Sequence, residues 1–508
     1  MNRRWILVPL ATGAVAAAAA VLAARSRSSH RTHRTMHRSR ARRNGQLARM
    51  GARVGATYAT TAARKTFASA ERREELDRHR ELRSAQQVAE ELGHMKGALM
   101  KLGQMASYLD DGLPEPLRLA LSQLQADAPP MSVELALATV ESELGRPVDE
   151  VFVEFDPEPI AAASIGQVHR ALYRDPGTGE ERAVAVKVQY PGVGDAIVAD
   201  LRNADLLGSL LRQGFGGLDP TEMVDEIKLR IAEEVDYELE ARNQQRFADY
   251  YRDHPFIRIP AVVPELSTCR VLTTELAEGF GWAELMRRPQ ADRDRVGEII
   301  FRFVFRSLYR MGAFNGDPHP GNYLFHEDGT VTFLDFGLVK HFSAEEMHTF
   351  GSMVRAAAVD HDHVEFRRIV EDAGMLQRDA PVSTDAVGAY FSHFYDTVRT
   401  DAEMTWTREY ANSIVRHTFD RTSPISQYAT VPRAFVFIQR INLGLYALLG
   451  ELRATGNYRR IASELWPFVG GAPSTDLGRA EAAWLAARAA RDEFDARRAA
   501  NATLAPNL

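Results

Sequence analysis

A loop near residue 320 carries the residue types that phosphoryl transfer requires. Asp317 lies in the stretch Asn-Gly-Asp-Pro-His-Pro-Gly-Asn, Asn322 ends that stretch, and Asp335 opens an Asp-Phe-Gly further on. Enzymes that transfer a phosphoryl group from ATP use one Asp to accept the proton of the attacking hydroxyl, and an Asn and a second Asp to hold Mg²⁺. A surface turn and an unrelated Asp-Phe-Gly would explain either segment alone. Their order and spacing together predict Asp317 as the catalytic residue and Asn322 and Asp335 as metal ligands.

Two predicted strand elements would position these groups. Apolar runs at residues 323–325 and 331–334, joined by Glu-Asp-Gly, predict a hairpin that carries Asn322 and Asp335 to one end. Upstream, the run Ala-Val-Ala-Val-Lys-Val at residues 183–188 predicts a strand that presents Lys187. A lysine at such a place neutralises the phosphates of ATP. Surface lysines on strands are common, so Lys187 gains its meaning from the acidic residues that follow.

Lys187 needs a carboxylate partner to hold it in place. Residues 220–249 have a helical pattern, and Glu234 lies near the apolar side of that pattern. We therefore assign Glu234 as the partner of Lys187, since kinases require such an ion pair. The alternative is that Glu233, Glu234 and Asp236 form a solvated acidic face.

The segment before Lys187 has the position of a phosphate-binding loop but an unusual composition. Such loops ordinarily contain several glycines, because glycine permits close approach of the backbone. Here Ala161, Ala162, Ala163 and Ser164 occupy the loop, which predicts a stiffer cover over the nucleotide. A further strand runs from residue 270 into a linker, where the backbone at Glu275 and Ala277 is placed to hydrogen-bond adenine.

These motifs together resemble the UbiB/AarF/ADCK family of atypical protein-kinase-like proteins. The resemblance rests on Lys-Leu-Gly-Gln at residues 101–104, the alanine-rich segment from residue 161, Glu-Val-Asp-Tyr from residue 234 and Asp-Pro-His-Pro-Gly-Asn from residue 317. It implies that the helices bearing Lys101 and Gln104 fold over the active site. Lys101 and Gln104 are three residues apart and therefore neighbours on one side of a helix, where a lysine and an amide suit phosphate, a metal-bound water or an acidic residue such as Asp236. We therefore assign Lys101, Gln104 and Asp236 a regulatory role. It also implies ATP and Mg²⁺ as cofactors and a role in isoprenoid-quinone biosynthesis or lipid homeostasis, with ATPase activity better supported than protein phosphorylation.

The chain departs from related patterns at two places that matter for function. Asn315 stands where ordinary kinases usually have a His, two residues before the catalytic Asp, so the anchoring of the catalytic loop is in question. No Ala-Pro-Glu follows Asp335, so the usual platform for a peptide substrate is missing.

The composition indicates a membrane-associated protein with a basic N-terminal segment. Residues 1–70 contain thirteen Arg, one Lys and no acidic residue, whereas the whole 508-residue chain has a net charge of −6. Residues 5–24 are uncharged and just long enough to span a bilayer, and the basic run that follows places the catalytic part in the cytoplasm. A cleaved signal peptide is the rival interpretation. An acidic body excludes nucleic acid as the main partner, and the single cysteine, Cys269, fits a reducing compartment.

The expected fold is α+β, a bilobal protein-kinase-like fold with a helical N-terminal extension. The predicted parts are a membrane anchor and basic tether (1–45), a helical Lys-x-Gly-Gln extension (46–130), a nucleotide-binding lobe (131–280), a helical lobe with the catalytic loop (281–475) and an amphipathic tail (476–508). The predicted function is an atypical kinase or ATPase at the cytoplasmic face of the cell membrane, with membrane lipid, a quinone precursor and quinone-biosynthesis proteins as partners. The alternatives are a small-molecule hydroxyl kinase of the aminoglycoside or choline type, and an ATP-gated scaffold without catalysis.

Overall fold

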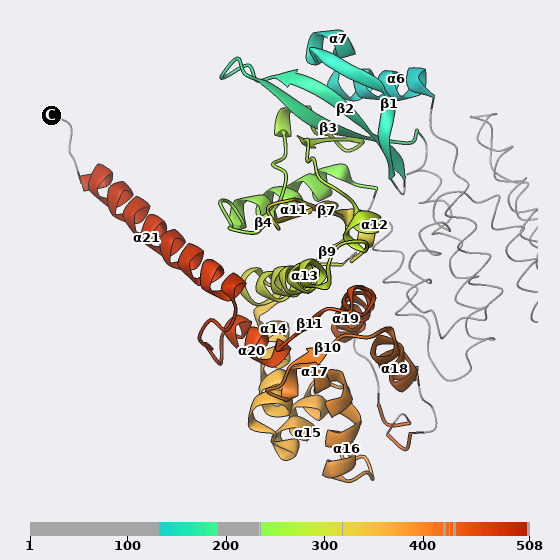
Figure 1. Ribbon diagram of the computed structural model, residues 1–508, viewed down its shortest axis with the longest axis vertical. Helices are drawn as coiled ribbons and strands as arrows, with labels where there is room; N and C mark the ends of the chain where they lie inside the picture. The colour runs from blue at the N-terminus through green and yellow to red at the C-terminus, as the bar shows by residue number, and fades with distance from the viewer. Residues whose placement is uncertain are drawn as a thin grey trace, which may run out of the picture. The chain divides into compact units, whose positions relative to one another are not determined.

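The first lobe is built on an antiparallel sheet (Figure 1). The computed structural model of the chain describes residues 132–163, 165–191, 233, 235–316, 318–419, 423–425, 427–429 and 433–504. The strands of the sheet follow the order β1-β2-β3-β5: β1 (Glu154–Ala163), β2 (Gly166–Arg174), β3 (Glu181–Gln189) and β5 (Val271–Glu275).

One face of this sheet forms a small core with two helices. Val184, Val186 and Val188 alternate along β3 and are fully buried, as expected for a strand with one face packed. They pack against α6 (Val133–Leu144) and α7 (Val148–Val151). The side chain of Ser132 caps the start of α6, and Gly145 ends it in the left-handed conformation.

Short strands and one helix connect the first lobe to the second. Helix α11 (Tyr237–Tyr250) follows the capping residue Asp236 and precedes β4 (Ile257–Arg258). The expected hairpin is confirmed: β7 (Tyr323–Phe325) and β8 (Val331–Phe333) pair antiparallel, and β4 pairs parallel to β8. The remaining strands of this region are β6 (Ala313–Asn315) and β9 (Val339–His341), which pair with each other.

The second lobe is mainly helical, as predicted, and is organised around the long helix α13 (Gln290–Met311). Its apolar side, including Ile299, Ile300 and Leu308, lies in the largest core of the described residues. The other elements of this lobe are α12 (Trp282–Leu285), α14 (Ala344–Val354), the π-helical turn Arg355–Asp360, α15 (His363–Asp372), α16 (Thr384–Ser392), α17 (Asp396–Arg399), β10 (Met404–Thr405), α18 (Arg408–Phe419), α19 (Arg433–Leu452), β11 (Thr455–Gly456), α20 (Tyr458–Leu465) and α21 (Asp476–Leu504). Short 3-10 helices occur at Pro264–Leu266, Pro320–Asn322 and His393–Tyr395.

The beginning of α21 is attached to the body by a buried charge cluster. Glu481 is 1% exposed and accepts hydrogen bonds from Arg302 (2.9 Å) and Arg306 (2.9 and 3.0 Å). Trp484 on the same helix is 8% exposed and donates to the carbonyl of Arg252. Trp484 therefore packs on the body of the protein and helps to fix the beginning of α21.

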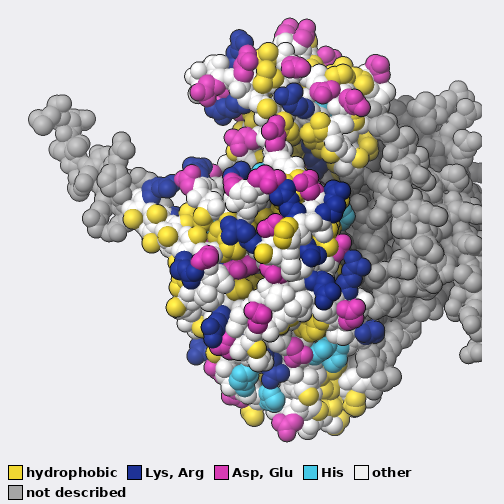
Figure 2. Space-filling view, viewed as in Figure 1, with side chains coloured by type: hydrophobic (Ala, Val, Ile, Leu, Met, Phe, Trp, Pro, Cys, Tyr) yellow, Lys and Arg dark blue, Asp and Glu magenta, His cyan; other side chains and the backbone are white. Residues whose placement is uncertain are grey.

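Two surface properties bear on the expected partners. Among the described residues, no helix combines the length and the apolarity that crossing a membrane requires; the predicted anchor at residues 5–24 lies outside them. On the face drawn in Figure 2, basic and acidic side chains of the described residues are interspersed, without a broad patch of one sign.

Candidate functional site

Lys187 projects from the sheet face opposite the small core. Its neighbours Val186 and Val188 are fully buried in that core, so the two-residue period of the strand turns Lys187 to the other side. β2 and β5 flank β3, pairing Lys187 with Val168 and Leu272 respectively. The lysine is thus held on a central strand, as the sequence predicts.

The carboxylate that pairs with Lys187 is Glu240. The Nζ atom of Lys187 lies 2.7 Å from Oε1 and 2.9 Å from Oε2 of Glu240, whose side chain is 3% exposed. The predicted partner, Glu234, is therefore corrected to Glu240. The physical reason is the helix boundary: α11 begins at Tyr237 and carries Glu240, whereas Glu234 precedes this helix and lies outside the described residues.

A sequence signal for Glu240 exists and was missed. Tyr237, Glu240, Gln244 and Phe247 recur at helical spacing and are all buried, so Glu240 lies on the inward side of α11. A charged residue between two buried aromatics at this spacing indicates a buried ion pair.

Asp335 is a second carboxylate beside Lys187. Its Oδ2 atom is 3.5 Å from the Nζ atom of Lys187, and its Oδ1 atom accepts a hydrogen bond from the backbone of Gly337 at 3.1 Å. Burial by itself would lower the pKa of Lys187, but the charges of Asp335 and Glu240 raise that pKa well above its ordinary value. Lys187 is therefore a permanent cation placed between two carboxylates.

The hairpin carries Asn322 and Asp335 to one end, as predicted. Tyr323 pairs with Phe333, and the backbone N–H of Leu334 donates to the carbonyl of Asn322 at 2.8 Å. Asn322 thus lies one residue before this pair, and Asp335 lies two residues after it. Carboxylate and amide oxygens are ligands that Mg²⁺ accepts in proteins, so the pair fits a magnesium ion held against phosphates.

Asn315 replaces the expected histidine and takes over an anchoring role. Its Nδ2 atom donates to the carbonyl oxygen of Asp335 at 3.0 Å, and Gly316 donates to Leu338 at 2.6 Å. Asp317 itself lies outside the described residues; the residue after it, Pro318, packs beside Gly444 of α19. The catalytic loop is therefore anchored on both sides of Asp317.

The alanine-rich segment is a strand end, which corrects the expectation of a loop. Ala161, Ala162 and Ala163 belong to β1 and pair with Val168, Gln167 and Gly166 respectively. Ser164 lies outside the described residues. The pairing extends to the last alanine because the connection to β2 is only two residues long. The alanines are thus constrained by cross-strand hydrogen bonds as well as by their Cβ atoms.

Gly166 allows this strand end to approach β3 closely. A Cβ atom at Gly166 would lie 2.3 Å from the carbonyl oxygen of Val188. A side chain there would force the strand end away from β3, so glycine is required at this one position of the segment.

The predicted adenine-binding linker follows β5. The backbone N–H of Glu275 donates to Ala261 at 2.9 Å, and that of Leu276 donates to Ala183 at 3.0 Å. These two donors hold the linker in the sheet and do not face a nucleotide. The use of the Glu275 carbonyl and the Ala277 backbone by adenine stays a prediction.

The predicted regulatory residues are described only in part. Lys101 and Gln104 lie outside the described residues. Asp236 caps α11, because its side chain accepts a hydrogen bond from the backbone of Leu239 at 3.1 Å. Asp236 therefore sets where the helix of Glu240 begins, and its contact with Lys101 or Gln104 stays a prediction.

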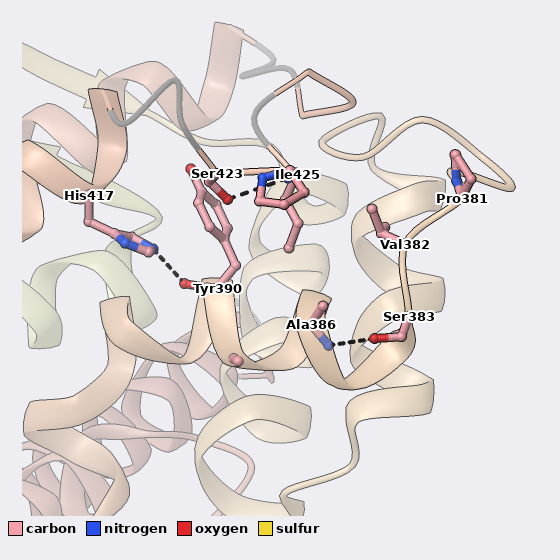
Figure 3. A pocket seen from close by; sticks show the side chains of 10 residues that line it. Pro381, Val382, Ser383, Ala386, Tyr390, His417, Ser423 and Ile425 are labelled. Carbon is pink, nitrogen blue, oxygen red and sulfur yellow. Dashed lines mark hydrogen bonds between the residues drawn. The ribbon is translucent and has the colours of Figure 1, made fainter.

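A separate pocket lies in the helical lobe (Figure 3). Its volume is about 560 Å³. Residues 381–383, helix α16 and residues 423–425 contribute most of its lining, and His417 of α18 completes it. His417 points its Nε2 atom at the carbonyl of Tyr390, at 2.8 Å. The lining contains none of the residues assigned to phosphate or metal binding, so this pocket is distinct from the site around Lys187.

Comparison with known proteins places this geometry in a family. Residues 123–370 match the model of the ABC1 atypical kinase-like domain. The chain is 35% identical over 310 residues to the chloroplastic protein ACTIVITY OF BC1 COMPLEX KINASE 1 of Arabidopsis thaliana. This alignment covers 59% of the present chain and 44% of the relative. It is 35% identical over 280 residues to the mitochondrial atypical kinase COQ8B of Rattus norvegicus, covering 54% of this chain and 52% of the relative.

A solved structure extends the likeness over more of the chain. The complex of Rv3197 with erythromycin from Mycobacterium tuberculosis aligns with a TM-score of 0.56 and 31% sequence identity, covering 78% of this chain and 99% of that one. In contrast, the matches to the curated relatives span about half of their length or less.

Proposed function

The chain belongs to the ABC1 atypical kinase-like family, also described as UbiB, AarF or ADCK proteins, and we propose that it binds Mg-ATP and transfers or hydrolyses its terminal phosphoryl group. The observation that carries this proposal is the position of Lys187 between Glu240 and Asp335, at 2.7 and 3.5 Å. Kinases place a lysine in this way to hold ATP phosphates beside the metal-binding Asp.

Each residue of the site has a distinct role in this proposal. Glu240 holds the ammonium group of Lys187, which attracts the phosphates. Asn322 and Asp335 would hold Mg²⁺, which neutralises charge on the phosphates when bound. Asp317 orients the acceptor hydroxyl or water and accepts its proton.

We place this activity at a membrane, in quinone or lipid metabolism. The relative COQ8B is an atypical mitochondrial kinase by name, and the family resemblance connects such proteins with isoprenoid quinones. The uncharged residues 5–24 and the basic run after them are the sequence basis for a membrane anchor. We propose membrane lipid or a quinone precursor as the partner of the active site, with the catalytic part in the cytoplasm.

A phosphate-release assay tests the enzymatic proposal. The full chain is incubated with Mg-ATP alone, with anionic lipid vesicles, and with a polyprenyl-phenol that mimics a quinone precursor. We expect Mg²⁺-dependent release that lipid or the phenol increases, and Lys187→Ala should lack it. Tight ATP binding without release under all conditions would favour the scaffold and contradict an enzyme.

A second candidate function follows from the solved relative. Because Rv3197 was solved with erythromycin, a molecule with several hydroxyl groups, phosphorylation of a hydroxyl-bearing small molecule is an alternative. Mass spectrometry of erythromycin incubated with the chain and Mg-ATP would detect the added phosphoryl group. An unmodified compound together with lipid-stimulated phosphate release would reject this alternative.

Membrane attachment needs its own test. The full chain should sediment with membranes even in high salt, because a spanning helix is not held by screened charges. Deletion of residues 1–45 should release a protein that still binds nucleotide. Release of the full chain by salt alone would contradict a spanning anchor.

A further inference from the structure

Asn243 connects the helix of Glu240 to the backbone beside Asp335. The residue is 5% exposed and lies three positions after Glu240 on α11. Its Nδ2 atom donates to the carbonyl oxygen of Phe336 at 3.3 Å, and its Oδ1 atom is 3.1 Å from the Nε2 atom of His341. A single amide thus joins α11, the Asp-Phe-Gly segment and β9.

The partners of His341 settle the direction of these hydrogen bonds. The Nδ1 atom of His341 lies 2.8 Å from Nη1 of Arg246, and a guanidinium group only donates. Nδ1 therefore accepts, so the proton of the neutral ring is on Nε2 and is donated to Oδ1 of Asn243. The amide must then present its NH₂ group to Phe336. Arg246 is itself fixed, because its Nη2 atom donates to the carbonyl of Met311 at 2.9 Å.

The carbonyl that Asn243 holds belongs to a backbone segment with an unfavourable conformation. Asp335 has a φ of 58°, in the left-handed region that non-glycine residues seldom adopt. Such a conformation persists only where the surroundings hold it. Asn315 binds the carbonyl of Asp335, and Asn243 binds the next carbonyl, that of Phe336. Two amides from different elements therefore fix consecutive peptide units.

The ring of Phe336 reinforces the same connection. It is fully buried, and its centroid lies 4.9 Å from that of Phe247, which is also on α11. The helix thus contacts the segment after Asp335 through both a hydrogen bond and an aromatic contact. Displacement of α11 would move Glu240 and the peptide units after Asp335 together.

From these contacts we propose that Asn243 is a positioning residue for the metal-binding carboxylate, oriented by the relay Arg246–His341–Asn243. The proposal rests on the proposed role of Asp335 as a magnesium ligand. It assigns to Asn243 and His341, which are not among the proposed phosphate or metal ligands, the task of holding Asp335 in its left-handed conformation. It also explains why a buried amide, and not an apolar residue, follows Glu240 by one helical turn.

The test compares two buried amides on the same helix. Gln244 is 3% exposed and donates to the carbonyl of Pro260 at 2.8 Å, away from Asp335, so Gln244→Leu is the matched control for Asn243→Leu. The measurement is the Mg²⁺ concentration that gives half-maximal ATP binding, with binding in EDTA and thermal unfolding recorded for each variant. We expect Asn243→Leu to raise the required Mg²⁺ about tenfold, with binding in EDTA unchanged. Gln244→Leu should lower the unfolding temperature alone.

A second variant keeps the proposal testable if Asn243→Leu does not fold. His341 is exposed, so His341→Ala should fold and raise the Mg²⁺ requirement in the same direction by a smaller factor. Unchanged Mg²⁺ dependence in His341→Ala, or equal shifts in Asn243→Leu and Gln244→Leu, would overturn the relay. Failure of the unmodified chain to bind ATP in a Mg²⁺-dependent way would instead overturn the proposed function itself.

Discussion

Replacement of Glu240 by glutamine should weaken ATP binding strongly while leaving the fold intact. Glutamine has nearly the shape of glutamate, so the side chain still fits the buried site on α11, but it no longer carries the charge that holds Lys187. Among the described residues, the other carboxylate beside the ammonium group is that of Asp335, which lies 3.5 Å away in the unmodified chain. We expect Lys187 to move toward Asp335 and to compete there with Mg²⁺.

The size of the effect follows from the contacts that are lost. Glu240 makes two charge-assisted contacts to Lys187, at 2.7 and 2.9 Å, and both groups are largely buried. A hydrogen bond to a charged group contributes about 1.5–3 kcal/mol net. If the free energy of ATP binding is reduced by this amount, the Kd for ATP rises about 10- to 150-fold. The Mg²⁺ concentration needed for ATP binding should rise as well, because Lys187 then competes with Mg²⁺ for the carboxylate of Asp335.

The assay is a titration with a fluorescent ATP analogue at fixed Mg²⁺. Glu238→Gln serves as the matched control, because Glu238 lies on the same helix with its side chain 57% exposed. Glu240→Gln should show the large loss and Glu238→Gln less than about a twofold change. A large loss in Glu234→Gln with little change in Glu240→Gln would refute the assignment of the ion pair.

Three further changes test other parts of the account. Burial would raise the pKa of Glu481, but hydrogen bonds from Arg306 and the positive charges of Arg306 and Arg302 bring it to about 2. Its stabilisation is therefore complete above about pH 4.5 and is lost as the pH falls toward 2. Glu481→Gln should cost about 3–5 kcal/mol in denaturant unfolding at neutral pH and flatten this acid dependence. Gly444→Ala would place a Cβ atom 2.5 Å from Pro318, so kcat should fall about tenfold or more while the Kd for ATP stays nearly constant; an unchanged kcat would show that α19 does not set the catalytic loop. Ala163→Gly should increase the backbone freedom at the end of β1 and change the ratio of ATP affinity to ADP affinity in the same titration. An unchanged ratio would show that the alanines do not influence nucleotide binding.

Local patterns were sufficient to predict the strands that carry the site. Alternating valines around Lys187 predict a strand with one buried face, and the structure has that strand and that face. The turn signal Glu-Asp-Gly between two short apolar runs predicts the hairpin that brings Asn322 and Asp335 to one end. Both predictions depend on neighbouring residues alone, which is why the sequence was enough.

The errors concern contacts between distant segments. Glu234 and Glu240 both have helical surroundings in sequence, and only the position of the helix start, set by the Asp236 cap, decides which one faces Lys187. The alanine segment has the composition of a loop, but its pairing with β2 is decided by cross-strand register. The role of Asn243 depends on three segments that meet only in the folded protein.

The most direct test of the central claim compares ATP binding and phosphate release in Asp317→Asn. In the proposed mechanism Asp317 acts on the acceptor, whereas Lys187 and Asp335 act on phosphates and metal. Asp317→Asn should therefore bind Mg-ATP with a Kd close to that of the unmodified chain and release no phosphate, while Asp335→Asn should lose the Mg²⁺-dependent binding. Phosphate release by Asp317→Asn at the unmodified rate would contradict a phosphoryl-transfer site at this position.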